Sequence, residues 1–198
     1  MAPSREDNKR QVSDALVESA WRLFTKHGFE ATTVDAIVEA AGCSRRTFFR
    51  YFPTKVAVVF PWRERRLDAF AGALERGLVA QPPLAAVRDA CLQMGQNYSD
   101  HAKRELARQR LVDASPALVA TELKIYEQWE KTIADAVTPR RPSDKRQRQA
   151  RIFAAATVGV LRTTLREWYD SDCEKNLVRL GRAAFDLLES GFSTDAMP

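Results

Sequence analysis

The sequence has few of the residues that build metal sites and disulfide frameworks. Its 198 residues include only three cysteines and two histidines. Cys43, Cys91 and Cys173 lie far apart, no CxxC pair occurs, and His27 and His101 form no HExxH-like pair. These spacings support neither a zinc site nor a disulfide framework, so we expect buried structural thiols rather than a redox switch. We expect no metal and no cofactor.

Long hydrophobic runs are also missing. No apolar stretch approaches the length that crosses a bilayer, and residues 1–10 lack the apolar segment of a secretory signal. We therefore expect a cytoplasmic protein without a membrane partner. An alternative is a membrane-surface role for residues 60–70, FPWRERRLDAF, whose aromatic and basic residues suit an interface. A linker helix is the simpler interpretation of that segment.

Catalytic motifs are absent as well. The chain contains no glycine-rich phosphate loop, no metal constellation and no nucleophile elbow. Residues 100–105, DHAKRE, include acidic and basic types, but neighbouring residues on a helix do not converge on one point. We predict that the protein is not an enzyme.

Glycine is sparse, with eight residues, and the alternation of β-branched residues typical of strands is nearly absent. Long segments instead place apolar residues at helical spacing, which predicts an all-α fold. We expect one short helix between an N-cap at Thr33 and a stop at Gly42, and another from Ser44 to about Tyr51. A further helix should start at Lys55 and kink or restart near Pro61. The longer helices are expected over residues 9–27, 84–98, 100–114, 115–137, 145–170 and 174–191.

What the sequence does contain is a local concentration of positive charge. The net charge of the chain is +5, and the stretch from Ser44 to Arg66 holds seven basic residues and one acid, Glu64. This composition suits a surface that binds a polyanion. A solvated charged face is the plainer alternative, because basic runs are common on protein surfaces.

The segment GCSRRTFFRYFPTK, residues 42–55, places arginines and aromatic residues on one short helix. Phe48 and Phe52 share a helical face and can close a small core, while the arginines lie on other faces. The turn before this helix has three to four residues and contains Gly42, as in a helix-turn-helix, whose second helix enters the DNA major groove. An ordinary helical hairpin with a basic surface is the alternative. The spacing, the two caps and the charge together favour DNA binding.

The predicted DNA contacts are of two kinds. Arg45 and Arg46 can bond guanine edges with two hydrogen bonds each, and Phe49 can touch a thymine methyl group. Lys55, other polar side chains of the segment and the N–H groups of the helix capped at Thr33 are placed to reach phosphates. The predicted DNA-binding set is Thr33, Ser44, Arg45, Arg46, Thr47, Phe49, Arg50, Tyr51 and Lys55.

The longer stretch GFEATTVDAIVEAAGCSRRTFFRYFPTKVAVV, residues 28–59, resembles the N-terminal domain of TetR-family transcriptional regulators. Within that family, SRRTFFRYFP is most similar to regulators of the mycofactocin-associated group. Phe49 stands where the family more often has tyrosine, and Cys43 replaces a more usual valine or isoleucine. The matching positions are Gly28-Phe29, Thr32-Thr33-Val34, Ile37, Ala41-Gly42, Ser44, Thr47-Phe48, Tyr51-Phe52 and Lys55.

The resemblance implies a ligand-responsive regulator, most simply a repressor that binds a palindromic operator as a homodimer and is released by a small hydrophobic or acyl-type effector. It assigns residues 1–54 to a helix-turn-helix DNA-binding domain, 55–80 to a connecting helix and 81–198 to a ligand-binding and dimerisation domain. The similarity to the mycofactocin-associated group makes acyl-CoA thioesters one effector class to test.

The resemblance also implies dimerisation through the last two long helices. Residues 152–161, IFAAATVGVL, are apolar nearly all round, so this segment should be buried on more than one side. Two such helices from each subunit would form a four-helix interface, and the alternative is that both are core helices within one chain. The predicted interface residues are Phe153, Ala156, Val160, Leu177, Leu180, Ala184 and Leu188.

A ligand pocket would come from the middle helices. Apolar walls with a few polar tips suit a cavity, although aromatic residues at helical spacing are more often plain core. The predicted pocket residues are Cys91, Met94, Tyr98, Leu111, Tyr126, Trp129 and Trp168.

Two other functions stay open. A helical protein-interaction module with a basic head would show salt-sensitive binding to an acidic partner without a preferred DNA sequence. An activator would use the same DNA-binding residues as a repressor, and the sequence does not separate the two.

Overall fold

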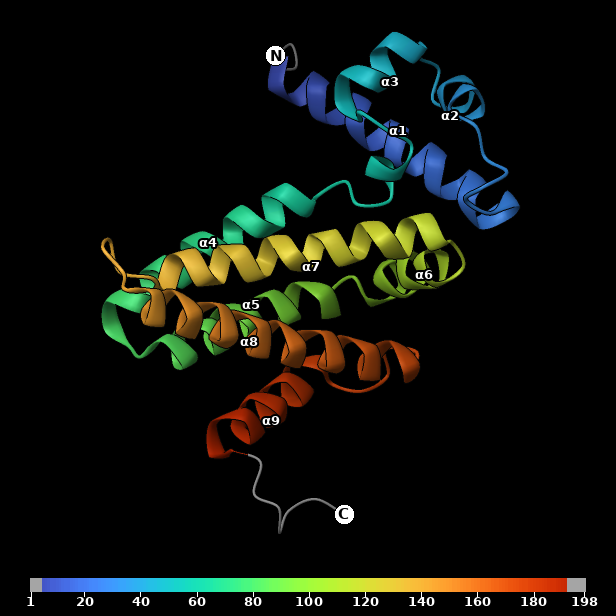
Figure 1. Cartoon of the computed structure of the whole chain (residues 1–198). Coiled ribbons are helices and arrows are strands. Elements are labelled where there is room, and N and C mark those ends of the chain that lie inside the picture. The colour runs from blue at the N-terminus through green and yellow to red at the C-terminus, as the bar shows by residue number, and fades with distance from the viewer. Residues whose placement is uncertain (1–4, 192–198) are drawn as a thin grey trace. The chain divides into compact units, whose positions relative to one another are not determined.

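The computed structural model describes residues 5–191, and over that range the chain folds into nine α-helices and one short 3-10 helix without any strand (Figure 1). The prediction of an all-α fold is confirmed. Residues 1–4 and 192–198, which begin and end the predicted domain ranges, lie outside the described residues. In chain order the helices are α1 (Arg5–His27), α2 (Val34–Ala40), α3 (Arg45–Tyr51), η1 (Val56–Val58), α4 (Arg63–Ala80), α5 (Pro83–Ser99), α6 (Ala102–Asp113), α7 (Pro116–Val137), α8 (Asp144–Asp170) and α9 (Leu177–Ser190).

None of the helices that the structure describes combines the length and the apolar character that crossing a lipid bilayer requires.

The two short helices α2 and α3 begin at the predicted caps. Thr33 Oγ1 and Ser44 Oγ each accept a hydrogen bond, 3.1 Å long, from the backbone N–H three residues later. Gly42 lies in the turn between the helices with a φ of 63°, which glycine adopts at little cost. Ile37 of α2 and Phe48 of α3 are both fully buried. The predicted helix-turn-helix is therefore confirmed as a local structure.

The segment after α3 differs from the prediction. A helix starting at Lys55 is wrong, because residues Val56–Val58 form only a 3-10 turn and α4 begins at Arg63. Pro61 accounts for the break, since proline lacks a backbone N–H and its ring clashes with the preceding turn of a helix. The expected restart near Pro61 is confirmed.

Packing divides the chain into two compact units. The head unit comprises Met1–Arg63 and Ala107–Glu122, and the body unit comprises Glu64–Leu106 and Leu123–Pro198. Helices α6 and α7 therefore each contribute residues to both units. The functional boundaries at residues 54 and 80 stay a prediction.

In the body unit, α9 packs against both α5 and α8. Helices α5 and α9 approach closely at Gly181, where an added Cβ atom would lie 3.0 Å from Leu92 Cδ2. Helix α9 begins at Leu177, later than the predicted residue 174. Asn176 sets this start, because its side chain accepts a hydrogen bond of 2.9 Å from the backbone N–H of Arg179 and caps the helix.

Candidate DNA-binding surface and ligand pocket

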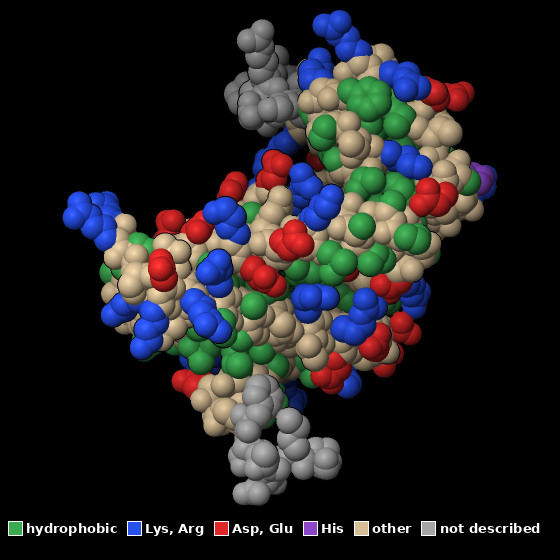
Figure 2. Space-filling model, in the orientation of Figure 1, with side chains coloured by type: hydrophobic (Ala, Val, Ile, Leu, Met, Phe, Trp, Pro, Cys, Tyr) green, Lys and Arg blue, Asp and Glu red, His purple; other side chains and the backbone are tan. Residues whose placement is uncertain are grey.

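The outward face of α3 gathers basic and aromatic side chains. Arg45, Arg46, Phe49 and Arg50 are exposed, whereas Phe48 is fully buried. The Phe49 side chain is 45% exposed, and Figure 2 shows hydrophobic side chains bordered by basic ones over α3. A molecule that binds this face of α3 can therefore contact both guanidinium groups and an apolar ring.

Arg45 and Arg46 differ in how they are held. The Arg45 guanidinium donates to both carboxylate oxygens of Asp35 on α2, each at 2.7 Å, and lies 5.8 Å from the centroid of the Phe49 ring. Both members of this ion pair are more than half exposed, so it contributes little to stability. Arg46 has no ion-pair or hydrogen-bond partner among the described residues. Arg45 is thus positioned in advance, and Arg46 is free to adapt to a partner.

The remaining side chains of α3 have local roles. The hydroxyl groups of Ser44 and Thr47 lie 3.0 Å apart at the start of the helix. The Arg50 guanidinium lies 5.1 Å from the centroid of the Tyr51 ring. The structure thus gathers the predicted DNA-binding residues from Ser44 to Tyr51 on one short helix and its cap. That these residues contact DNA stays a prediction.

Lys55 requires a correction. We expected its ammonium group to reach a phosphate, but Nζ donates to the carbonyl oxygens of Phe29 at 2.7 Å, Thr32 at 2.9 Å and Glu30 at 3.4 Å. Nζ also lies 4.2 Å from the centroid of the Phe29 ring. An ammonium group has three N–H donors, and these carbonyls use all three. Lys55 therefore ties the loop between α1 and α2 to the segment that follows α3.

Replacing Lys55 by methionine should lower the free energy of unfolding by about 2 kcal/mol. This is the contribution of about one hydrogen bond to a charged group, which is about 1.5–3 kcal/mol. Urea denaturation of the variant checks this value. Lys26→Met, at an exposed site on α1, is the matched control and should be nearly neutral. A Lys55→Met protein of unchanged stability whose DNA affinity falls with a flatter salt dependence would restore the phosphate contact.

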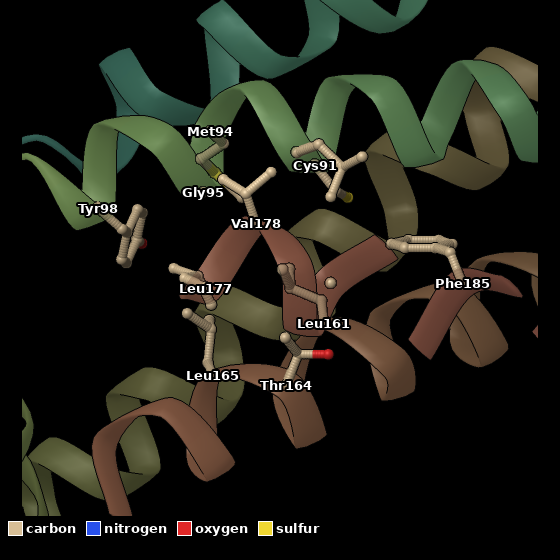
Figure 3. A pocket seen from close by; sticks show the side chains of 12 residues that line it. Cys91, Met94, Gly95, Tyr98, Leu161, Thr164, Leu165, Leu177, Val178 and Phe185 are labelled. Atoms are coloured by element: carbon tan, nitrogen blue, oxygen red, sulfur yellow. The ribbon is translucent and has the colours of Figure 1, made fainter. Parts of the chain in front are cut away.

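A pocket lies in the body unit between α5, α8 and α9 (Figure 3). Its volume of about 20 Å³ is enough for about one water molecule, so a larger ligand must displace side chains. Burial raises the pKa of Cys91 to about 12, and its thiol therefore stays protonated at neutral pH. The lining residues are Cys91, Leu92, Met94, Gly95, Tyr98, Leu161, Thr164, Leu165, Leu177, Val178, Gly181 and Phe185.

The structure brings three of the seven predicted pocket residues together, and these are Cys91, Met94 and Tyr98. The sequence analysis did not predict that α9 lines the pocket. The apolar residues around Gly181 were the sequence signal for this role. The other four predicted residues lie outside this wall. Leu111 belongs to the head unit, and Trp168 is fully buried beside Tyr169. The Trp129 ring is tilted against Phe70, with the ring centroids 4.6 Å apart, and the Arg162 guanidinium lies 5.0 Å from the centroid of the Tyr126 ring.

The predicted dimer residues separate into inward and outward groups. Leu177 is 4% exposed and lines the pocket, so its assignment to a dimer interface is corrected. Phe153, Val160 and Leu188 are half-buried against the core of the body unit, Leu180 packs on a second buried cluster, and Ala184 is half-buried. Ala156 is exposed.

The outward apolar face of α8 and α9 includes residues that the prediction omitted. Ile152 is 59% exposed and Leu187 is 49% exposed, and Ala155, Ala156 and Gly159 are also exposed. On α8 these residues share one face of the helix. A Cβ atom added at Gly159 would meet nothing within 4 Å, so no contact inside the chain requires glycine there. We call this surface the α8–α9 face.

An ion pair connects the wall of the pocket to the start of α4. Arg66 on α4 donates to the carboxylate of Glu105 on α6, and Glu105 is 2% exposed. The same guanidinium lies 4.5 Å from the centroid of the Tyr98 ring, which lines the pocket. Arg66 therefore links a side chain of the pocket wall to the first turn of α4.

Comparison with known proteins places this arrangement in a family. Residues 16–60 match the family described as bacterial regulatory proteins, tetR family, and residues 81–193 match the MftR C-terminal domain. The chain belongs to the TetR family of transcriptional regulators. It is a DNA-binding regulator, and the prediction that it is not an enzyme is confirmed by that membership.

Individual relatives resemble the chain over most of its length. The regulator TcmR of Streptomyces glaucescens is 32% identical, covering 86% of this chain and 80% of that protein. MftR of Mycobacterium tuberculosis, whose name refers to mycofactocin biosynthesis, is 29% identical over 94% of this chain and 92% of its own. The crystal structure of the repressor FadR of Thermus thermophilus with lauroyl-CoA has a TM-score of 0.59 and 22% identity, covering 94% of this chain and 97% of that one. This last likeness shows the TetR fold.

Proposed function

We propose that this TetR-family regulator is a repressor that binds a palindromic operator as a homodimer and releases it when a small, largely apolar effector enters the body unit. The exposed Arg46–Phe49–Arg50 surface of α3 carries the DNA-binding part of the proposal. It combines donors for guanine edges with an apolar ring for a thymine methyl group.

Dimerisation would occur through the α8–α9 face. Helix α8 offers exposed alanines and a glycine, so a second α8 could approach closely, and Ile152 and Leu187 would lose their exposed apolar area. Figure 2 shows hydrophobic side chains gathered where α8 and α9 reach the surface. Two recognition helices about 34–36 Å apart would then read half-sites one turn of DNA apart.

The effector part of the proposal rests on the pocket and on relatives. The pocket wall is largely apolar, and Figure 3 shows its side chains converging from three helices. FadR of Thermus thermophilus was crystallised with lauroyl-CoA, so acyl-CoA thioesters are the first class to test here, with the uncharged acyl chain in the pocket and the charged CoA part outside it. Because the pocket volume is only about 20 Å³, such a ligand must displace side chains of the wall. This displacement would couple ligand binding to a conformational change.

The release mechanism would use Arg66. A ligand that shifts Tyr98 would alter the position of Arg66 and Glu105, at the start of α4 and α6. Helix α6 continues into the head unit, where Ser115 Oγ, just after α6, donates to Glu30 Oε1 at 2.7 Å. Glu30 lies in the loop that Lys55 holds. A coupling free energy of about 1–3 kcal/mol between effector and operator would be sufficient.

Arg46→Ala should weaken binding to the operator by about 1–3 kcal/mol and relax specificity at one base pair, because a guanidinium bonded to a guanine edge contributes that much discrimination. Competition binding against operators changed at single positions measures both effects. Arg140→Ala, in the exposed loop before α8, is the control and should leave affinity and specificity unchanged. Uniform weakening across all operators would show instead that Arg46 contacts a phosphate.

A further inference from the structure

Among the threonines inside the described helices, Thr164 differs from several others in its hydrogen bonding. A threonine within a helix can donate to a carbonyl of the preceding turn. Thr121 on α7 and Thr157 on α8 do so, as does Thr138 directly after the end of α7. Thr164 lies two turns after Thr157 on the same face of α8 and is 5% exposed, but its Oγ1 has no hydrogen-bond partner in the described structure.

Thr164 lies in the wall of the pocket. Figure 3 shows it beside Leu161, among side chains that are apolar except for the hydroxyl of Tyr98 and the thiol of Cys91. A buried hydroxyl without a partner has lost its hydrogen bonds to water and gained none in return, which destabilises the folded state. A ligand that accepts a hydrogen bond from Oγ1 would recover this free energy.

The pocket has no group that would neutralise a charged ligand. None of the twelve lining residues in the described chain is a lysine, arginine, histidine, aspartate or glutamate. The nearby Arg66 is already paired with Glu105. Burial keeps the Cys91 thiol protonated, so it adds no charge. A carboxylate buried here would lose its hydration without gaining a counter-ion.

We propose that the pocket between α5, α8 and α9 selects neutral apolar ligands with a single carbonyl group, such as a ketone, ester or thioester, and that this carbonyl accepts a hydrogen bond from Thr164. This inference rests on the proposed effector response and specifies its chemistry. It places a free fatty acid at a disadvantage against its neutral derivatives.

Three matched probes test the selection on the full chain. Methyl pentyl ketone supplies the carbonyl, hexanoate has the same alkyl chain with a carboxylate, and an alkene of the same shape replaces the carbonyl oxygen by a methylene group. Calorimetric titration should show that the ketone binds about three- to tenfold more tightly than the alkene, which is the value of one neutral hydrogen bond. Hexanoate should bind at least about tenfold more weakly than the ketone.

The ratio of ketone to alkene affinity is the decisive readout, because a change in stability affects both ligands alike. The ratio should fall to about one in Thr164→Val and persist in Thr164→Ser, which keeps the hydroxyl. Thr163→Val, at the exposed neighbouring position, should leave it unchanged. An unchanged ratio in Thr164→Val, equal binding of hexanoate, or no binding of the ketone would each overturn the proposal.

Operator binding, measured on the same samples, distinguishes failure of the proposed function from failure of the inference about ligand chemistry. If a DNA site is bound and released by some effector while the ketone ratio ignores Thr164, only the inference about ligand chemistry fails. If the ratio depends on Thr164 and no DNA sequence is preferred, the pocket chemistry stands and the proposed function fails.

Discussion

Arg66→Met should lower the free energy of unfolding by about 3–5 kcal/mol, the usual cost of removing one partner from a buried ion pair. Glu105 is 2% exposed, so its carboxylate cannot turn to water when the guanidinium is lost. Methionine keeps an apolar side chain beside Tyr98, so the lost stability arises mainly from removing the positive charge. Because whole domains are stable by only about 5–15 kcal/mol, this change should be plain in urea denaturation.

A second substitution separates charge from packing in this prediction. Replacing both partners, Arg66→Met with Glu105→Leu, should recover most of the lost stability, because an apolar pair carries no desolvation cost. Lys131→Met breaks the Lys131–Asp135 pair, whose side chains are 75% and 66% exposed, and should cost less than about 1 kcal/mol. A loss below about 1 kcal/mol in Arg66→Met would contradict the role given to this ion pair.

Gly159→Leu should convert the proposed dimer to monomers and lower operator affinity by about 10²–10⁴-fold, the usual gain from linking two binding modules. The added side chain would fill the closest approach between two α8 helices. Within one chain it meets nothing within 4 Å at Cβ, and leucine is a better helix former than glycine by up to about 1 kcal/mol. Each subunit should therefore stay folded and lose only its partner.

Sedimentation and operator titration check the Gly159 prediction together. Gly72→Leu is the matched control, because Gly72 also lies within a helix and an added Cβ there meets only the flexible end of Arg76, at 3.3 Å. That control should remain dimeric. A Gly159→Leu protein that sediments as a dimer and binds the operator normally would place the interface elsewhere.

Features with local signals were predictable from the sequence. The caps at Thr33 and Ser44, the turn at Gly42 and the buried Phe48 all depend on residues within a few positions of one another. The long helices were also predictable, because their apolar spacing extends over several turns. Once Phe48 was assigned to the core, helical geometry also predicted that the arginines of α3 are exposed.

Features that depend on distant residues were not predictable in this way. Lys55 donates to carbonyls more than twenty positions earlier, and no local pattern distinguishes that role from a phosphate contact. Residues 152–161 are apolar on every side, so the pattern did not separate Ile152, which faces outward, from Leu161, which faces the pocket. The attachment of residues 107–122 to the head unit likewise follows from tertiary packing.

Selection from a random-sequence DNA pool tests the central claim most directly. The purified full chain is incubated with the pool without any effector, and the retained DNA is sequenced. We expect enrichment of an inverted repeat whose half-sites are centred about 10 base pairs apart, or a multiple of that spacing. Retained DNA with the same sequence distribution as the input pool would contradict it, and would favour a basic head that binds an acidic partner.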